Sequence, residues 1–157
     1  QTIVENTPLF AMDLVVVNER NELLVGERLN APAEDWWFVP GGRVFKNESL
    51  PDAFKRISND ELGHQCTIDE AQLLGVFDHF YEDSIFDSHT STHYINASHF
   101  IRMRTGELNL PTGEQHSNYR WVSLLEVASD SSIHQFSKVF MPQLDRLINV
   151  GESYLDL

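Results

Sequence analysis

The sequence predicts one α/β (α+β) domain in which a mixed β-sheet is sandwiched between helices. Five short runs have the composition of strands, and two longer stretches carry apolar residues at helical spacing. The chain has 157 residues, of which 41% are hydrophobic, so it is long enough for one core and too short for two ordinary domains. We therefore expect residues 1–157 to form a single domain.

The expected strands are bounded by polar or turn-forming residues. They cover residues 11–17, 23–29, 72–81, 93–104 and 119–123. A second helix is expected over residues 134–149, although Pro142 within this range predicts a later start or a kink. A short helical turn is expected over residues 124–128.

The first helix is expected over residues 49–62. Ser49 and Asp52 have the spacing of a capping box, proline is tolerated in a first turn, and Gly63 should end the helix. Its apolar residues share one stripe, on which Glu61 also falls. A carboxylate there is either a solvated residue of the last turn or the partner of a cation.

Residues 41–63 contain a longer pattern that resembles the Nudix box, G-x5-E-x7-R-E-U-x-E-E-x-G-U, in which U is a bulky apolar residue. The matching positions are Gly42, Glu48, Arg56, Asp60, Glu61 and Gly63. The sequence departs from the box at Ile57, where the family normally has a metal-site glutamate, and also at Ser58, His64 and the shorter Asp60. This site therefore has fewer carboxylates than that of an ordinary Nudix hydrolase.

The resemblance extends to one branch of that superfamily, the GDP-mannose mannosyl hydrolases. The similar segments are NTP at residues 6–8, WFVPGGRV at 37–44, HFY at 79–81, THY at 92–94, and EQH followed by YRW between residues 114 and 121. The resemblance implies a Nudix fold, hydrolysis of GDP-mannose or GDP-glucose to GDP and free hexose, and a homodimer.

The same resemblance implies a site for Mg²⁺ or Mn²⁺. Its ligands would be the Gly41 carbonyl, the Glu61 carboxylate and the Gln115 side chain, with phosphate oxygens and water completing the shell. An oxygen shell with one carboxylate is reasonable for Mg²⁺. Glu48 and Asp60 are expected to hold Arg56 and the loop rather than the metal.

His116 is the candidate general base, because the family's EQH histidine has that role and an ordinary imidazole pKa near 6.5 suits proton abstraction at neutral pH. It lies in a loop between two expected strands, where it could reach a ligand. Asp13 interrupts an apolar strand and matches an aspartate that acts at the sugar. His79 matches another active-site histidine, whereas His134 has no functional argument in the sequence.

Three arginines from separate segments, Arg28, Arg43 and Arg56, are candidates to bind the diphosphate, because a guanidinium donates paired hydrogen bonds and stays charged. Arg56 could instead pair with an acidic neighbour one helical turn away. Tyr94 is expected to orient the diphosphate.

Composition limits the kinds of molecule that the protein is expected to bind. A net charge of −13 argues against a nucleic-acid groove, and no apolar run is long enough to span a membrane. The single cysteine, Cys66, cannot form an internal disulfide, so we expect a cytoplasmic protein that binds a small nucleotide sugar. Two other functions remain open: a pyrophosphatase that cleaves the phosphoanhydride of a nucleotide sugar, and a Nudix domain that only binds a nucleotide.

Overall fold

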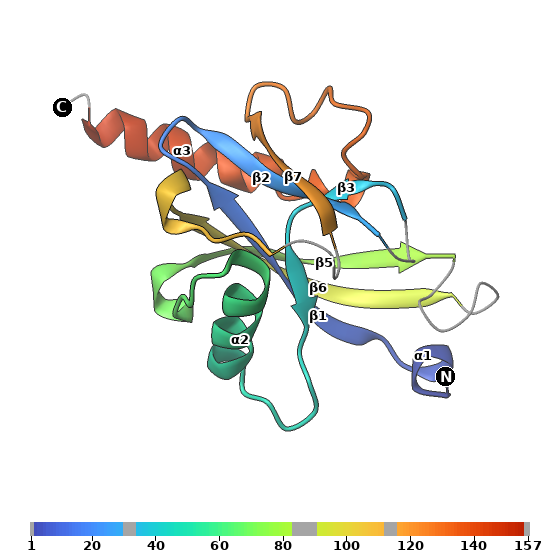
Figure 1. The fold of residues 1–157 in the computed structure, drawn as a ribbon. Helices are drawn as coiled ribbons and strands as arrows, with labels where there is room; N and C mark the ends of the chain where they lie inside the picture. Colours follow the sequence, from blue (N-terminus) through green and yellow to red (C-terminus); the bar gives the residue numbers. More distant parts are fainter. Residues whose placement is uncertain (1, 30–33, 83–90, 112–115, 156–157) are drawn as a thin grey trace.

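The computed structural model describes residues 2–29, 34–82, 91–111 and 116–155, with the backbone alone for residues 2, 116–117 and 150–155. The described part forms seven strands in one mixed sheet with helices on both faces (Figure 1). The elements in chain order are α1 Thr2–Asn6, β1 Leu9–Val17, β2 Glu22–Arg28, β3 Trp37–Phe38, β4 Gly41–Arg43, α2 Leu50–Leu62, β5 Gln72–Tyr81, β6 Thr92–Arg102, β7 His116–Ser123 and α3 Met141–Leu155, with short 3₁₀ turns η1 Ile68–Glu70, η2 Thr105–Glu107 and η3 Gln135–Ser137.

Strand β1 is the centre of the sheet. It runs parallel to β6 along its whole length, and β6 pairs antiparallel with β5. On its other edge β1 has two antiparallel partners: β4 pairs with residues 11–13, and β2 joins it at Val17 and Leu23. Strands β3 and β7 both pair with β2, so the sheet divides beside β1 into a β4 arm and a β2 arm.

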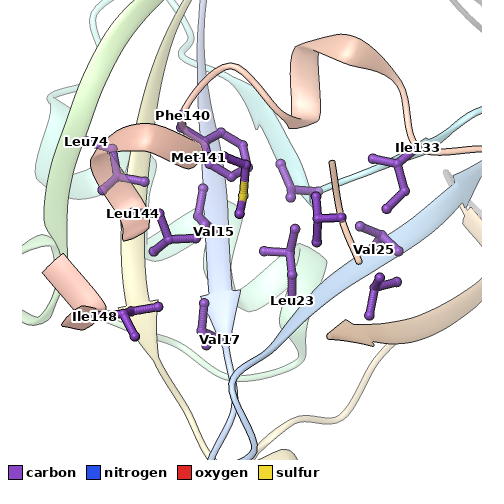
Figure 2. Close-up of a cluster of buried hydrophobic side chains, with 13 residues drawn as sticks. Val15, Val17, Leu23, Val25, Leu74, Ile133, Phe140, Met141, Leu144 and Ile148 are labelled. Atoms are coloured by element: carbon purple, nitrogen blue, oxygen red, sulfur yellow. The ribbon is translucent and has the colours of Figure 1, made fainter. Parts of the chain in front are cut away.

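Alternating side chains of β1 feed two hydrophobic cores. Met12, Leu14 and Val16 pack with Phe54 and Ile57 of α2. Val15 and Val17 face the opposite core, which α3 closes (Figure 2). The α3 core is lined by Leu23, Val25, Leu74, Ile133, Phe140, Met141, Leu144 and Ile148. Asp13 shares the alternation of Val15 and Val17, so it belongs to the α3 face of the sheet.

Most expected elements are confirmed. Helix α2 follows Ser49, whose side chain accepts a hydrogen bond from the Asp52 N–H, and it ends at Gly63, whose φ of 63° is left-handed. Strand β5 has the predicted limits. The described residues contain no helix that is both long enough and apolar enough to cross a membrane.

Several boundaries differ from the sequence predictions. Strand β1 begins at residue 9 rather than 11, β2 covers residues 22–28 rather than 23–29, and β6 covers 92–102 rather than 93–104. Three further differences are larger. Helix α3 begins at Met141 rather than 134, so Pro142 lies in its first turn, where a missing N–H costs little. Residues 124–128 form turns rather than a helix. Strand β7 begins at His116 rather than 119, because its polar first residues pair with the end of β2.

Candidate active site

The division of the sheet beside β1 brings three segments together. Asp13 of β1 lies directly opposite Gly41 of β4, and Ala11 lies opposite Arg43. Strand β2 has separated from β1 at this level, and its last residue, Arg28, lies close enough to Asp13 for its charge to act on the carboxyl. The sheet thus collects an aspartate, two arginines and a glycine carbonyl from distant parts of the sequence.

Asp13 is held closely on two sides. The Asn96 amide Nδ2 donates a hydrogen bond of 2.9 Å to Asp13 Oδ1. A Cβ on Gly41 would lie 2.5 Å from the same oxygen, so glycine is needed there for the strands to approach. Burial raises the pKa of the Asp13 carboxyl to about 7, although the Asn96 hydrogen bond and the charge of Arg28 oppose this shift.

Tyr94 lies on the same face. Strand register places it opposite His79 of β5 and beside Leu9 of β1. Burial raises the pKa of the Tyr94 phenol, while the positive charges of Arg43 and Arg28 act against that rise. Tyr94 is therefore near both arginines that are expected at the diphosphate, and its hydroxyl remains a neutral hydrogen-bond donor.

Arg56 is occupied by other groups of its loop. Its guanidinium donates from Nε to Glu48 Oε2 at 2.7 Å and from Nη2 to the Arg43 carbonyl at 2.7 Å. The guanidinium carbon Cζ lies 3.9 Å from the ring centre of Phe45. Arg56 Nη1 also forms a long ion pair with Asp60 Oδ2, at 3.9 Å. Glu48 thus holds Arg56 and the loop, as expected, and Arg56 fixes the strand that carries Arg43. Its reach to a diphosphate stays a prediction.

Glu61 is a buried carboxylate on the inner face of α2, 8% exposed. Burial, together with the negative charge of Glu61, raises the pKa of Tyr119 to about 12. Ile57, one turn earlier, is 1% exposed, and its side chain would be 3.2 Å from a Cβ on Gly42. An apolar side chain therefore fills the position where the family normally has a metal-site glutamate.

These residues fit a cation site with one carboxylate. The described residues contain no group of three or more His, Cys, Asp and Glu side chains that could hold a metal ion. The proposed set of the Gly41 carbonyl, Glu61 and Gln115 needs only one carboxylate, and Glu61 is a buried glutamate on the helix that packs against β4. Gln115 lies outside the described residues, so its part in this set stays a prediction.

His79 borders the site on the β5 side. Its ring is stacked on Phe136 with the ring centres 4.4 Å apart. It is 4% exposed, and burial together with the neighbouring His134 lowers its pKa to about 4. His79 is therefore a neutral ring, and no hydrogen-bond partner for its buried Nε2 occurs within the described residues.

His134, for which the sequence suggested no role, lies in an aromatic wall beside Arg28. Its ring stacks on Phe38 at 4.6 Å and meets Trp36 edge-on at 5.2 Å. Burial and the charge of Arg28 lower its pKa to about 4. Its Nδ1 accepts the Phe136 N–H at 3.1 Å, so the neutral ring carries its proton on Nε2.

No local signal in the sequence identifies this wall. The sequence predicts that residues 134–137 open the second helix, but they form the 3₁₀ turn η3 and its cap, and residues 132–134 reach the sheet through backbone pairing with β3. Trp37 exchanges hydrogen bonds with Ser132 and His134, and the Val39 N–H donates to Ser137 Oγ. Only that long-range pairing places His134 near Arg28 of β2 and Phe136 against His79 of β5.

The backbone of His116 lies at the same end of the sheet. It opens β7 directly opposite Arg28 of β2. The predicted base is therefore carried by a strand whose first residue adjoins the arginine end of the site, while the role of its side chain stays a prediction.

Comparison with known proteins agrees with this architecture. The NUDIX domain profile matches residues 7–144. The chain is 38% identical over 156 residues to the low-salt glycan biosynthesis protein Agl8 of Haloferax volcanii, a match that covers 99% of this chain and 85% of that protein.

Among solved structures, a MutT NUDIX hydrolase from Burkholderia pseudomallei superposes with a TM-score of 0.71 at 22% identity, over 88% of this chain and 98% of that one. The NUDIX domain of Shewanella oneidensis NrtR complexed with ADP ribose gives a TM-score of 0.67 at 15% identity, over 91% and 90%. At these identities the two structures establish the fold, which is the predicted α/β Nudix sandwich.

Proposed function

Because this chain belongs to the NUDIX domain family, it is a hydrolase of nucleotide-linked compounds, and we propose that its substrate is a GDP-hexose such as GDP-mannose. The products are GDP and the free sugar. The relative from Haloferax volcanii is named for glycan biosynthesis, and nucleotide sugars are the activated donors for glycan synthesis, which supports this substrate class.

The observation that carries the proposal is the difference between the two faces of the site. The inner face of α2 offers Glu61 and an apolar Ile57, so the cluster of glutamates with which Nudix enzymes attack phosphorus is depleted. The sheet face instead offers Asp13 between Gly41 and Asn96, with Arg28 nearby. An anion on a low-polarity face suits a sugar carbon that gains positive charge as its bond breaks.

In the proposed reaction, a water oxygen bonds to the anomeric carbon while the bond from that carbon to the β-phosphate oxygen breaks. GDP leaves with the bonding electron pair, and His116 takes the proton of the water. Asp13 faces the positive charge that develops on the sugar. Arg28 and Arg43 stabilise the negative charge on GDP, and Tyr94 donates a hydrogen bond that orients the diphosphate.

Arg56 supports this arrangement by fixing the Arg43 strand and the glycine turn. His79 lies next to the substrate as a neutral ring. Gly41, Glu61 and Gln115 would hold Mg²⁺ or Mn²⁺, which when bound neutralises charge on the diphosphate. We further propose that the protein acts as a homodimer.

Hydrolysis in ¹⁸O-labelled water tests the proposal. GDP-mannose is incubated with the protein and Mg²⁺, and the products are analysed by mass spectrometry and phosphorus NMR. We expect the label in the free hexose and unlabelled GDP. Label in a phosphate, or release of a hexose phosphate with GMP, would establish attack on phosphorus and reject the proposed reaction.

A further inference from the structure

Asn96 is a buried polar residue that neither the composition nor the sequence motifs singled out. It lies on β6, is 3% exposed, and donates from Nδ2 to Asp13 Oδ1 at 2.9 Å. Strand β6 runs parallel to β1, with Asn96 opposite Ala11 and Ser98 opposite Asp13. Asn96 therefore reaches diagonally across the strand pair to the carboxylate.

Ser98 fixes which end of the Asn96 amide faces Asp13. The Ser98 hydroxyl is fully buried and donates to Asn96 Oδ1 at 3.3 Å. An amide whose oxygen accepts from a serine must present its NH₂ group on the other side. The two hydrogen bonds therefore run in one direction, because Ser98 donates to Asn96 and Asn96 donates to Asp13.

The contact also restricts the rotation of the Asp13 carboxylate. Asn96 and the backbone of Gly41 both approach the same oxygen, Oδ1. Turning the carboxylate away from this orientation would break the hydrogen bond from Asn96. One rotamer is therefore favoured before any ligand arrives, which is the form of preorganisation that electrostatic catalysis requires.

We propose that Asn96, backed by Ser98, is a positioning residue that holds Asp13 in the orientation needed at the sugar. This inference rests on the proposed function for its kinetic consequence. Asn96 itself does not contact the substrate, so we expect it to affect catalysis only by holding Asp13 in place.

A double-mutant cycle separates positioning from a general structural role. Asn96→Leu keeps a similar volume and removes the donor. We expect kcat to fall about 10- to 100-fold with little change in KM, as for the loss of a hydrogen bond to a charged group. In an Asp13→Ala background, the same substitution should change kcat less than about 2-fold, because the carboxylate that Asn96 positions is then absent.

Ser98→Ala should lower kcat by a smaller factor, about 2- to 10-fold, since it only loosens the amide. Ser58→Ala is the matched control, because Ser58 is also fully buried and hydrogen-bonded but lies on α2 against Cys66. It should leave kcat unchanged. Equal losses for Asn96→Leu in both backgrounds, or no loss in the wild-type background, would overturn the proposal.

The contact can also be tested without turnover. The Asn96 side-chain amide is assigned in the ¹⁵N–¹H NMR spectrum as the pair of signals missing from Asn96→Leu. One of its protons should be shifted downfield and exchange slowly, and Asp13→Ala should remove both properties. An unchanged signal in Asp13→Ala would refute the contact, whereas wild-type protein that hydrolyses no GDP-hexose while showing this signal would reject the proposed function and not the contact.

Discussion

Two carboxylates of this protein lie near arginines, yet their pKa values are shifted in opposite directions. Glu48, in the loop before α2, receives two hydrogen bonds from the Arg56 guanidinium and one from the Phe45 N–H, and these lower its pKa to about 2. For Asp13, on the sheet, burial raises the pKa to about 7 and outweighs the hydrogen bond from Asn96 and the charge of Arg28.

The difference lies in how much each negative charge is compensated. The loop pair is a closed clamp with paired hydrogen bonds and an aromatic ring beneath the guanidinium. Among the described residues, the sheet carboxylate has the Asn96 hydrogen bond and the nearby charge of Arg28 against its desolvation, which is an unfavourable state for a residue that only stabilises the fold. Such under-compensated groups gather at functional sites, because they are completed by a ligand or a transition state.

The largest effect should come from Glu61, the buried carboxylate of α2. If it ligates the cation, Glu61→Gln should lower kcat/KM by roughly 10³-fold or more and weaken the dependence on Mg²⁺, because several kcal/mol of charge stabilisation are lost. Asp60→Asn, on the exposed side of the same turn, should change activity only mildly. Both variants are assayed across a Mg²⁺ titration. Similar losses of activity for the two would show that Glu61 is not the metal ligand.

The next effect concerns His116. His116→Gln keeps a comparable size but cannot take a proton, so kcat should fall about 10²- to 10⁴-fold. GDP affinity, measured by calorimetry, should change little, since the base meets water and sugar rather than diphosphate. His64→Gln, at an exposed position, is the control. If His116→Gln retains full kcat, the base must be sought elsewhere, with His79 the next residue to test.

The smallest effect tests the comparison itself through thermal stability in EDTA. Glu48 has a folded pKa of about 2 against an ordinary 4.5, so its contribution is present above pH 4.5 and is lost as the pH falls toward 2. Glu48→Gln should therefore lower Tm by a few degrees at pH 7, and the gap to wild type should close in acid.

Asp13→Asn should change Tm in the opposite direction. The Asp13 pKa rises from 3.8 to about 7, so wild-type stability is full below pH 3.8 and is lost as the pH rises through 7. The asparagine carries no charge to desolvate, so Tm of the variant should exceed that of wild type at pH 8 and match it near pH 4. Asp69→Asn, on an exposed residue, is the control. If Glu48→Gln and Asp13→Asn shifted Tm in the same direction at pH 8, the contrast between the stabilising Glu48 and the desolvated Asp13 would be wrong.

Much of the fold could be predicted from local chemistry. The helix over residues 49–62 and the strand over 72–81 carry their own signals, a cap with a glycine stop and an apolar run. The late start of α3 could be anticipated only in outline, because Pro142 forbids a mid-helix position but does not choose the first turn. The early start of β7 was missed, since its polar residues owe their strand conformation to pairing with β2.

The candidate site divides in the same way. Glu61, Arg56 and Glu48 lie in one continuous motif whose spacing is set by a helix and its cap, so the sequence alone placed a carboxylate on the apolar stripe of the helix and an arginine near acidic neighbours, while it left the burial of Glu61 open. Asn96, His134 and Phe136 carry no such pattern. They reach Asp13, Arg28 and His79, respectively, through strand register and backbone pairing across the sheet, and because those contacts join residues far apart in the chain, only the tertiary structure decided them.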